Sequence, residues 1–212
     1  MKKPKKKNAI LQTIITHIQN NKKQYAIVAI IFLIGLIIGV SLINNEKISS
    51  DETSSYINEF IGNLKNNYQI DKANLLKKSI TNYLIIAVIM WFMGSTVIGI
   101  PVVYLIVAFK GFSLGYTISC IMLALGTLKG MLFTILSLLL QNIISIPCIL
   151  ALAVSGMKLY KSIIKDKRKE NIKIEILRHT VFSLFITGIL VIASVVEVYI
   201  SSSLVSSSIN LL

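Results

Sequence analysis

The sequence predicts an all-α membrane protein with five transmembrane helices, an N-terminus inside the cell and a C-terminus outside. Apolar residues make up 54% of the 212 residues and charged residues only 15%, and long stretches carry almost no charge. Because a bilayer core about 30 Å thick needs roughly 20 apolar residues per helix, such stretches use most of the chain. A large soluble domain therefore has no room.

The basic residues supply the topology. Segment 1–24 carries seven lysines and no acid, segment 158–178 carries eight basic residues and three acids, and the whole chain has a net charge of +13. Cytoplasmic loops are enriched in Lys and Arg, and five spans place both blocks on one side of the membrane. The blocks lack the interleaved aromatics of a nucleic-acid site, so we expect no nucleic acid partner. Segment 1–24 is instead a cytoplasmic tail suited to anionic membrane lipid.

The first helix is predicted over the apolar run 25–43, and the polar segment 44–79 that follows has no net charge. We expect this segment to be an outer helical loop. Four apolar residues in it repeat at i, i+3, i+4 and i+7, the stripe of an amphipathic helix, and offer a surface for partner binding. The alternative is that the stripe packs on the protein's own helices or on lipid headgroups. Its members are Ile57, Phe60, Ile61 and Leu64.

Residues 80–200 are predicted to form a four-helix membrane core. The apolar run 83–128 is too long for one span, and Gly94–Pro101 provides a turn because proline favours the first turn of a helix. A turn at Lys110–Gly111 is the alternative. The predicted segments are helix 80–98, helix 101–125, helix 131–157, the basic cytoplasmic loop 158–178, helix 180–200 and the outer tail 201–212.

The motifs of catalytic sites are missing from the sequence, which has neither an H-E-x-x-H nor a Walker motif. Both histidines, His17 and His179, lie in or beside predicted cytoplasmic segments. An intramembrane aspartyl protease would need a pair of acids within the membrane, which the spacing of the acids does not allow. We therefore expect no enzyme, no cofactor and no metal site. The acids outside segment 44–79 are Asp166, Glu170, Glu175 and Glu197.

Polar residues within predicted spans mark functional or architectural sites. Lys110 lies about 13 Å into its helix from the inner side, and Gln141 and Asn142 lie about 15 Å into theirs from the outer side. In a core of about 30 Å these depths nearly coincide, so we hypothesise that Lys110 donates to the carbonyl of Gln141 or Asn142. Snorkelling of Lys110 to the inner interface, or a substrate or proton path, are the alternatives. Glu197 and Lys129 share a level near the outer interface, where they either pair or are both hydrated.

Several residues indicate how the helices pack. Pro147 removes a hydrogen-bond donor from its helix and is expected to kink it. Small residues four positions apart let helices approach closely, which supports tight packing and permits a homo-oligomer. These pairs are Gly35–Gly39, Gly111–Gly115 and Gly126–Gly130.

Three segments occur in a fixed order: WFMGSTVIGIPVVYLIVAFKGFSLGY from Trp91, KG at 129–130 and LLLQNIISIP at 138–147. In this order they resemble the stage II sporulation protein M family, with its G-x-P turn, its KGF-x-x-G segment and its PQN-x-x-x-IP-like segment. Leu140 stands where that family often has a proline. The residues in matching places are Gly99, Pro101, Lys110, Gly111, Gly115, Lys129, Gln141, Asn142 and Pro147.

The resemblance implies a non-enzymatic scaffold that acts in engulfment of the forespore during sporulation. Such a protein would lie in the cell membrane at the septum and the engulfing membrane. It would organise two peptidoglycan-degrading partners, stage II sporulation proteins D and P. Two other functions stay open: an accessory membrane regulator, and a small transporter with a midplane site at Lys110, Gln141, Asn142 and Pro147.

Overall fold

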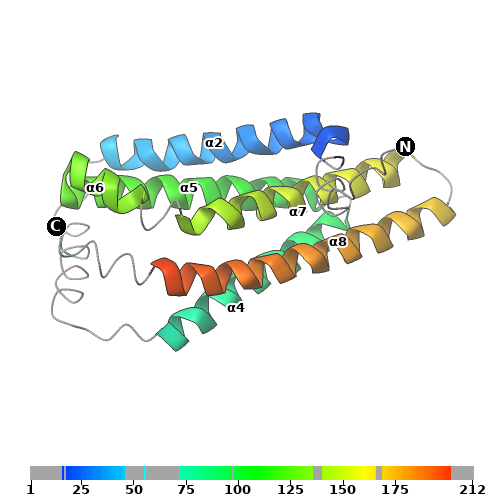
Figure 1. Ribbon diagram of the computed structural model, residues 1–212. Helices are drawn as coiled ribbons and strands as arrows, with labels where there is room; N and C mark the ends of the chain where they lie inside the picture. The colour runs from blue at the N-terminus through cyan, green and yellow to red at the C-terminus, as the bar shows by residue number, and fades with distance from the viewer. Residues whose placement is uncertain are drawn as a thin grey trace, which may run out of the picture.

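The computed structural model describes residues 16, 18–45, 55, 72–96, 98–135, 140–165 and 169–201. All regular elements in these residues are helical, and five of them, α2, α4, α5, α7 and α8, are long and apolar enough to cross a membrane (Figure 1). The prediction of an all-α fold with five spans is thereby confirmed. The elements are α2 (Lys22–Asn45), α4 (Lys72–Gly94), α5 (Ile100–Leu125), α6 (Thr127–Thr134), α7 (Leu140–Lys165), α8 (Lys169–Val196) and the π-helical turn η2 (Glu197–Ser201).

Large apolar side chains cover the outside of the bundle. Leu105, Phe109 and Leu184, for example, are 68%, 69% and 68% exposed. A soluble protein rarely exposes apolar surface on this scale, whereas lipid tails cover such side chains without cost. The protein is therefore a multi-pass membrane protein. Its own core is formed by buried residues that include Val28, Phe32, Ala87, Met90, Val103, Val107, Ile149, Leu152, Val154 and Leu190.

In Figure 1, α2, α5 and α7 lie along one side of the bundle, and α4 and α8 lie along the other. Helix α7 joins the two sides because it contacts both α4 and α8. We name the end of the bundle where α2 begins, α7 ends and α8 begins the basic end. It holds basic residues of both blocks, among them Lys22, Lys23, Lys158, Lys161, Lys173 and Arg178.

Glycines hold α2 and α5 together. A Cβ atom at Gly35 would collide with the Ala108 carbonyl oxygen, and a Cβ atom at Gly111 would collide with the Phe32 carbonyl oxygen. The two backbones are thus in direct contact, and their residue numbers rise together, so the helices run parallel. One turn further along, Gly39 and Gly115 make the same kind of approach to Phe112 and Leu36. Two of the predicted small-residue pairs therefore pack against each other within one chain.

The turn between α4 and α5 lies where the sequence places it, within 94–101. Gly99 is buried, its N–H donates to the Thr96 carbonyl at 3.3 Å, and a Cβ atom there would collide with the Met93 carbonyl oxygen. Pro101 lies in the first turn of α5, where its missing N–H leaves no intrahelical hydrogen bond unmade. The G-x-P pattern is thus explained by backbone geometry.

The region after α5 differs from the single helix expected over 131–157. It contains α6 and α7, and residues 136–139 between them lie outside the described residues. The helix is interrupted at Gly126, whose φ of 78° lies in the left-handed region that glycine enters without a steric penalty. Helix α6 then lies against α5, with Gly130 close to the α5 backbone. Lys129, which lies between the helices predicted over 101–125 and 131–157, is exposed on α6.

Polar helix extends beyond the predicted spans. Helix α7 runs on to Lys165 and α8 begins at Lys169, so most of the expected loop 158–178 is helical. Lys, Arg and Glu favour helix, and an ion pair between Glu175 and Arg178 one turn apart adds support. Helix α4 begins at Lys72, within the segment 44–79 that we expected to be a helical loop, and continues into the predicted helix 80–98 as far as Gly94. The partner-binding stripe at Ile57, Phe60, Ile61 and Leu64 and the tail 202–212 lie outside the described residues.

Candidate functional site

Lys110 lies about 15 Å along α5, at the level of the membrane interior. Its ammonium nitrogen is 5.5 Å from the centre of the Tyr83 ring on α4. Tyr83 itself is only 4% exposed. A cation within about 6 Å of an aromatic ring is attracted by the ring's negative face, and the attraction grows when water is excluded. Tyr83 therefore stabilises a charge that lipid alone would not.

The hydroxyl group of Tyr83 extends this contact to two further helices. It interacts with the hydroxyl of Ser145 on α7 and with the carboxylate of Glu197 at the end of α8. Ser145 donates to Asn142 Oδ1 at 3.3 Å, and Ser79 on α4 donates to Glu197 Oε2 at 3.1 Å. Hydrogen bonds to buried polar groups are costly to lose, because nothing in the membrane core replaces them.

These side chains form one network, the polar cluster, in the half of the bundle away from the basic end. The cluster contains one positive and one negative charge, and Lys110 and Glu197 attract each other across it. An opposite charge nearby lowers the cost of a charge in the bilayer core. The members of the polar cluster are Ser79, Tyr83, Lys110, Asn142, Ser145 and Glu197.

Glu197 enters the cluster through an irregular stretch of backbone. The α-helical part of α8 ends at Val196, and Glu197 begins the π-helical turn η2. A π-helical turn has a wider hydrogen-bonding ring than an α-helix, changes the direction of the side chains that follow, and occurs often at functional sites. The turn thus marks the polar cluster as the candidate functional site.

The sequence predicts a hydrogen bond from Lys110 to Gln141 or Asn142, and the structure places Lys110 and Asn142 near each other in the polar cluster. Lys110 and Asn142 belong to the same cluster and are connected through Tyr83 and Ser145. A direct hydrogen bond from Lys110 to Asn142 stays a prediction. Gln141 lies in the first turn of α7, but its side chain lies outside the described residues.

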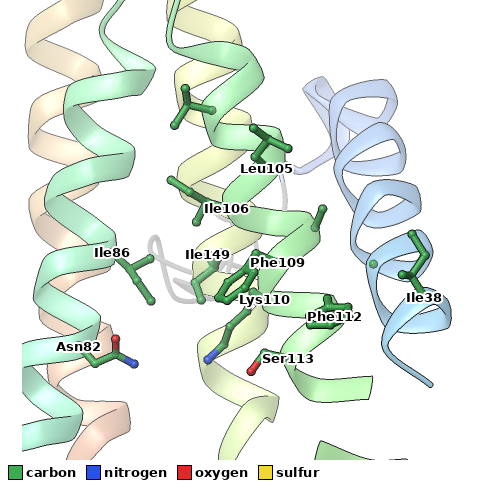
Figure 2. A pocket seen from close by; sticks show the side chains of 13 residues that line it. Ile38, Asn82, Ile86, Leu105, Ile106, Phe109, Lys110, Phe112, Ser113 and Ile149 are labelled. Carbon is green, nitrogen blue, oxygen red and sulfur yellow. The ribbon is translucent and has the colours of Figure 1, made fainter. Parts of the chain in front are cut away.

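A groove opens beside the polar cluster along the face of α5 (Figure 2). Its volume is about 670 Å³, and residues of α2, α4, α5 and α7 line it. Most of its lining is apolar, but Figure 2 shows the Lys110 side chain pointing into the gap between α5 and α4, with Asn82 on the facing helix. The groove therefore leads from the surrounding membrane to Lys110, which is a member of the polar cluster.

The remaining predicted site residues have other positions. Gly111 and Gly115 face α2 and are packing residues, and Gly99 and Pro101 shape the turn before α5. Pro147 lies inside α7, as expected, and its side chain is exposed. These residues build the frame that holds Lys110 and Asn142 in place.

Sequence reasoning missed three members of the cluster, namely Ser79, Tyr83 and Ser145. Serine and tyrosine are common in membrane helices, so a depth argument singles out neither. The one available signal was depth combined with helix phase, since Ser79 and Tyr83 are four residues apart and lie on one face of α4. Among the residues that the structure describes, no group of three His, Cys, Asp or Glu side chains could hold a metal ion.

Taken together, the five apolar helices and the polar cluster between them define a polytopic helical membrane protein with an internal polar network. The family model described as stage II sporulation protein M matches residues 28–202, which is most of the chain. The chain therefore belongs to the stage II sporulation protein M family and is a sporulation-related membrane protein. Neither the curated proteins nor the solved structures contain a match to it.

Proposed function

We propose that this chain is a non-enzymatic scaffold for forespore engulfment, which organises peptidoglycan-degrading partners at the septal membrane. The observation that carries the proposal is the family match across residues 28–202. The partners that the family implies are stage II sporulation proteins D and P. The proposal places the chain at the sporulation septum and then along the engulfing membrane.

The geometry supports a scaffold in two ways. The backbone contact between α2 and α5 and the polar cluster between α4, α5, α7 and α8 tie the spans into one body. The basic residues of both blocks that the structure describes lie together at the basic end. Under the positive-inside rule, this arrangement agrees with a cytoplasmic N-terminus and an outer C-terminus. This orientation would turn segment 44–79, with its apolar stripe at 57–64, toward the wall and its hydrolases.

Partner localisation tests the scaffold. Fluorescent fusions of stage II sporulation proteins D and P would be imaged at the septum in a strain with the chain and in a strain without it. The proposal expects septal foci that disperse when the chain is deleted and return when it is supplied in trans. Foci that persist unchanged in the deletion strain would refute the scaffold role.

One observation favours a small transporter as a second candidate. Lys110 belongs to the polar cluster and also borders the groove, and polar residues beside a cavity near the midplane are typical of substrate sites. The Lys110→Met variant separates the two functions. A transporter should lose more function than the change in its abundance accounts for, whereas a scaffold should keep function in proportion to its abundance. Lys110→Arg, which retains the charge, is the matched control.

A further inference from the structure

A second polar site lies at the basic end, between α7 and α8, which run side by side there (Figure 1). A pocket of about 120 Å³ opens between them, roughly the volume that four water molecules occupy in the liquid. One small oxyanion fits such a space. We name it the interface pocket; it is lined by Ser155, Lys158, Leu159, Glu175, Arg178, His179 and Phe182.

One wall of the interface pocket is fixed by buried hydrogen bonds. His179 Nδ1 lies 2.8 Å from Ser155 Oγ, and its Nε2 lies 3.4 Å from the Trp91 carbonyl oxygen. A carbonyl oxygen can only accept, so Nε2 carries a proton, and Nδ1 shares a hydrogen bond with the Ser155 hydroxyl. Gly94 and Gly156 cross in close backbone contact beside this pair. The wall is therefore rigid.

The opposite wall carries the charge. The Glu175 carboxylate holds two cations together, with Arg178 Nη1 at 2.7 Å and Lys158 Nζ at 3.8 Å. The three side chains together leave one positive charge in excess. The side chains of Lys158 and Arg178 are 48% and 66% exposed, and a guanidinium has five N–H donors, whereas Glu175 accepts from Arg178 at Nη1. Both cations can therefore turn further donors toward an anion in the pocket.

The position of the pocket along the helices identifies its surroundings. The Trp91 indole N–H donates to Thr180 Oγ1 at 3.1 Å, and tryptophan gathers at the headgroup level of membranes. Beyond Lys158 and Arg178, α7 and α8 continue for about 10 to 14 Å. This continuation is rich in charged residues, which belong in water. The interface pocket thus lies at the level of the lipid phosphates.

We propose that the interface pocket binds the phosphate of an anionic phospholipid headgroup. Lys158 and Arg178 contact the phosphate oxygens, Glu175 keeps the two cations adjacent, and the Ser155–His179 pair forms the back of the site. A soluble phosphate shares this chemistry, but the depth of the pocket favours the lipid. Bound lipid would stabilise the contact between α7 and α8 at the membrane surface. This effect does not depend on whether the chain organises hydrolases.

The test uses the purified full chain in neutral detergent, titrated with phosphatidylglycerol, and counts bound lipid by native mass spectrometry. Lys158→Gln and Arg178→Gln should each weaken phosphatidylglycerol binding about fivefold, the effect of one cation near an anionic headgroup. Lys173→Gln removes the same charge from the exposed surface of α8 at the same end and should have little effect. Lys158→Arg and Arg178→Lys should restore binding, which separates lost affinity from misfolding.

Two results would overturn the proposal. One is equal binding of phosphatidylglycerol and phosphatidylcholine, and the other is a loss in Lys173→Gln as large as in Lys158→Gln. A parallel titration with inorganic phosphate identifies the source of the anion. If inorganic phosphate binds in a way that depends on Lys158 and Arg178 and phosphatidylglycerol does not bind, the lipid proposal is overturned. The pocket would then be assigned to a soluble phosphate.

Discussion

Replacing Gly111 with alanine should weaken the contact between α2 and α5. A Cβ atom at this position would meet the Phe32 carbonyl oxygen, which is backbone and cannot move aside as a flexible side chain would. The two helices must separate locally to admit the methyl group. Forcing an extra carbon atom into a tightly packed region costs about 1 to 3 kcal/mol.

Gly188 provides a matched control for the same change. It lies on α8, and a Cβ atom there would meet nothing within 4 Å. Both substitutions gain about 0.5 to 1 kcal/mol because alanine forms helix better than glycine does. The gain cancels when the variants are compared. The free energy of unfolding of Gly111→Ala should therefore be about 1 to 3 kcal/mol below that of Gly188→Ala.

The measurement is equilibrium unfolding of the purified chain in mixed micelles with increasing SDS, followed by the loss of helical circular dichroism. Wild type, Gly111→Ala and Gly188→Ala would be compared at one protein concentration, so that any self-association contributes equally. If Gly111→Ala is as stable as Gly188→Ala, the parallel α2–α5 contact is not as close as described. The assignment of the glycine pairs to packing within the chain would then fail.

Three further predictions concern the polar cluster and the interruption of the helix at Gly126. Tyr83→Phe removes the hydroxyl that interacts with Ser145 and Glu197, and should lower the free energy of SDS unfolding by about 0.6 to 1.7 kcal/mol; no change would show that the hydroxyl carries no stability. Lys110→Met should cost about 1 to 3 kcal/mol in the same assay, and adding Glu197→Gln should recover part of the loss, whereas strictly additive losses would argue against their coupling. Gly126→Ala should cost about 1 to 3 kcal/mol, because a φ of 78° with a ψ of 160° is a backbone conformation that essentially only glycine adopts; a neutral result would contradict this conformation.

Much of the fold follows from hydropathy and from a few glycines and prolines. The five spans are apolar runs, and the turn at 94–101 follows from a proline that begins a helix after a buried glycine. The interruption of the helix at Gly126 was harder to predict from the sequence. A glycine within an apolar run is read equally well as a packing residue, and its positive φ depends on how α6 lies against α5.

The site was only partly predictable, because membrane depth can be counted along a sequence while helix rotation and helix neighbours cannot. Counting placed Lys110 near the level of Asn142, and both belong to the polar cluster. Tyr83 enters the cluster because of the way α4 is turned, and Glu197 enters through a π-helical turn. The glycine pairs likewise indicated close approach without indicating that α2 and α5 are the two helices involved.

Membrane-dye microscopy of a clean deletion strain passing through sporulation tests whether the chain acts in engulfment, as we propose. Cells without the chain should halt at the asymmetric septum with the septal wall not thinned, and they should recover when the wild-type chain is restored. Normal engulfment in the deletion strain would contradict the scaffold proposal and leave the transporter or an accessory regulator as the function to pursue.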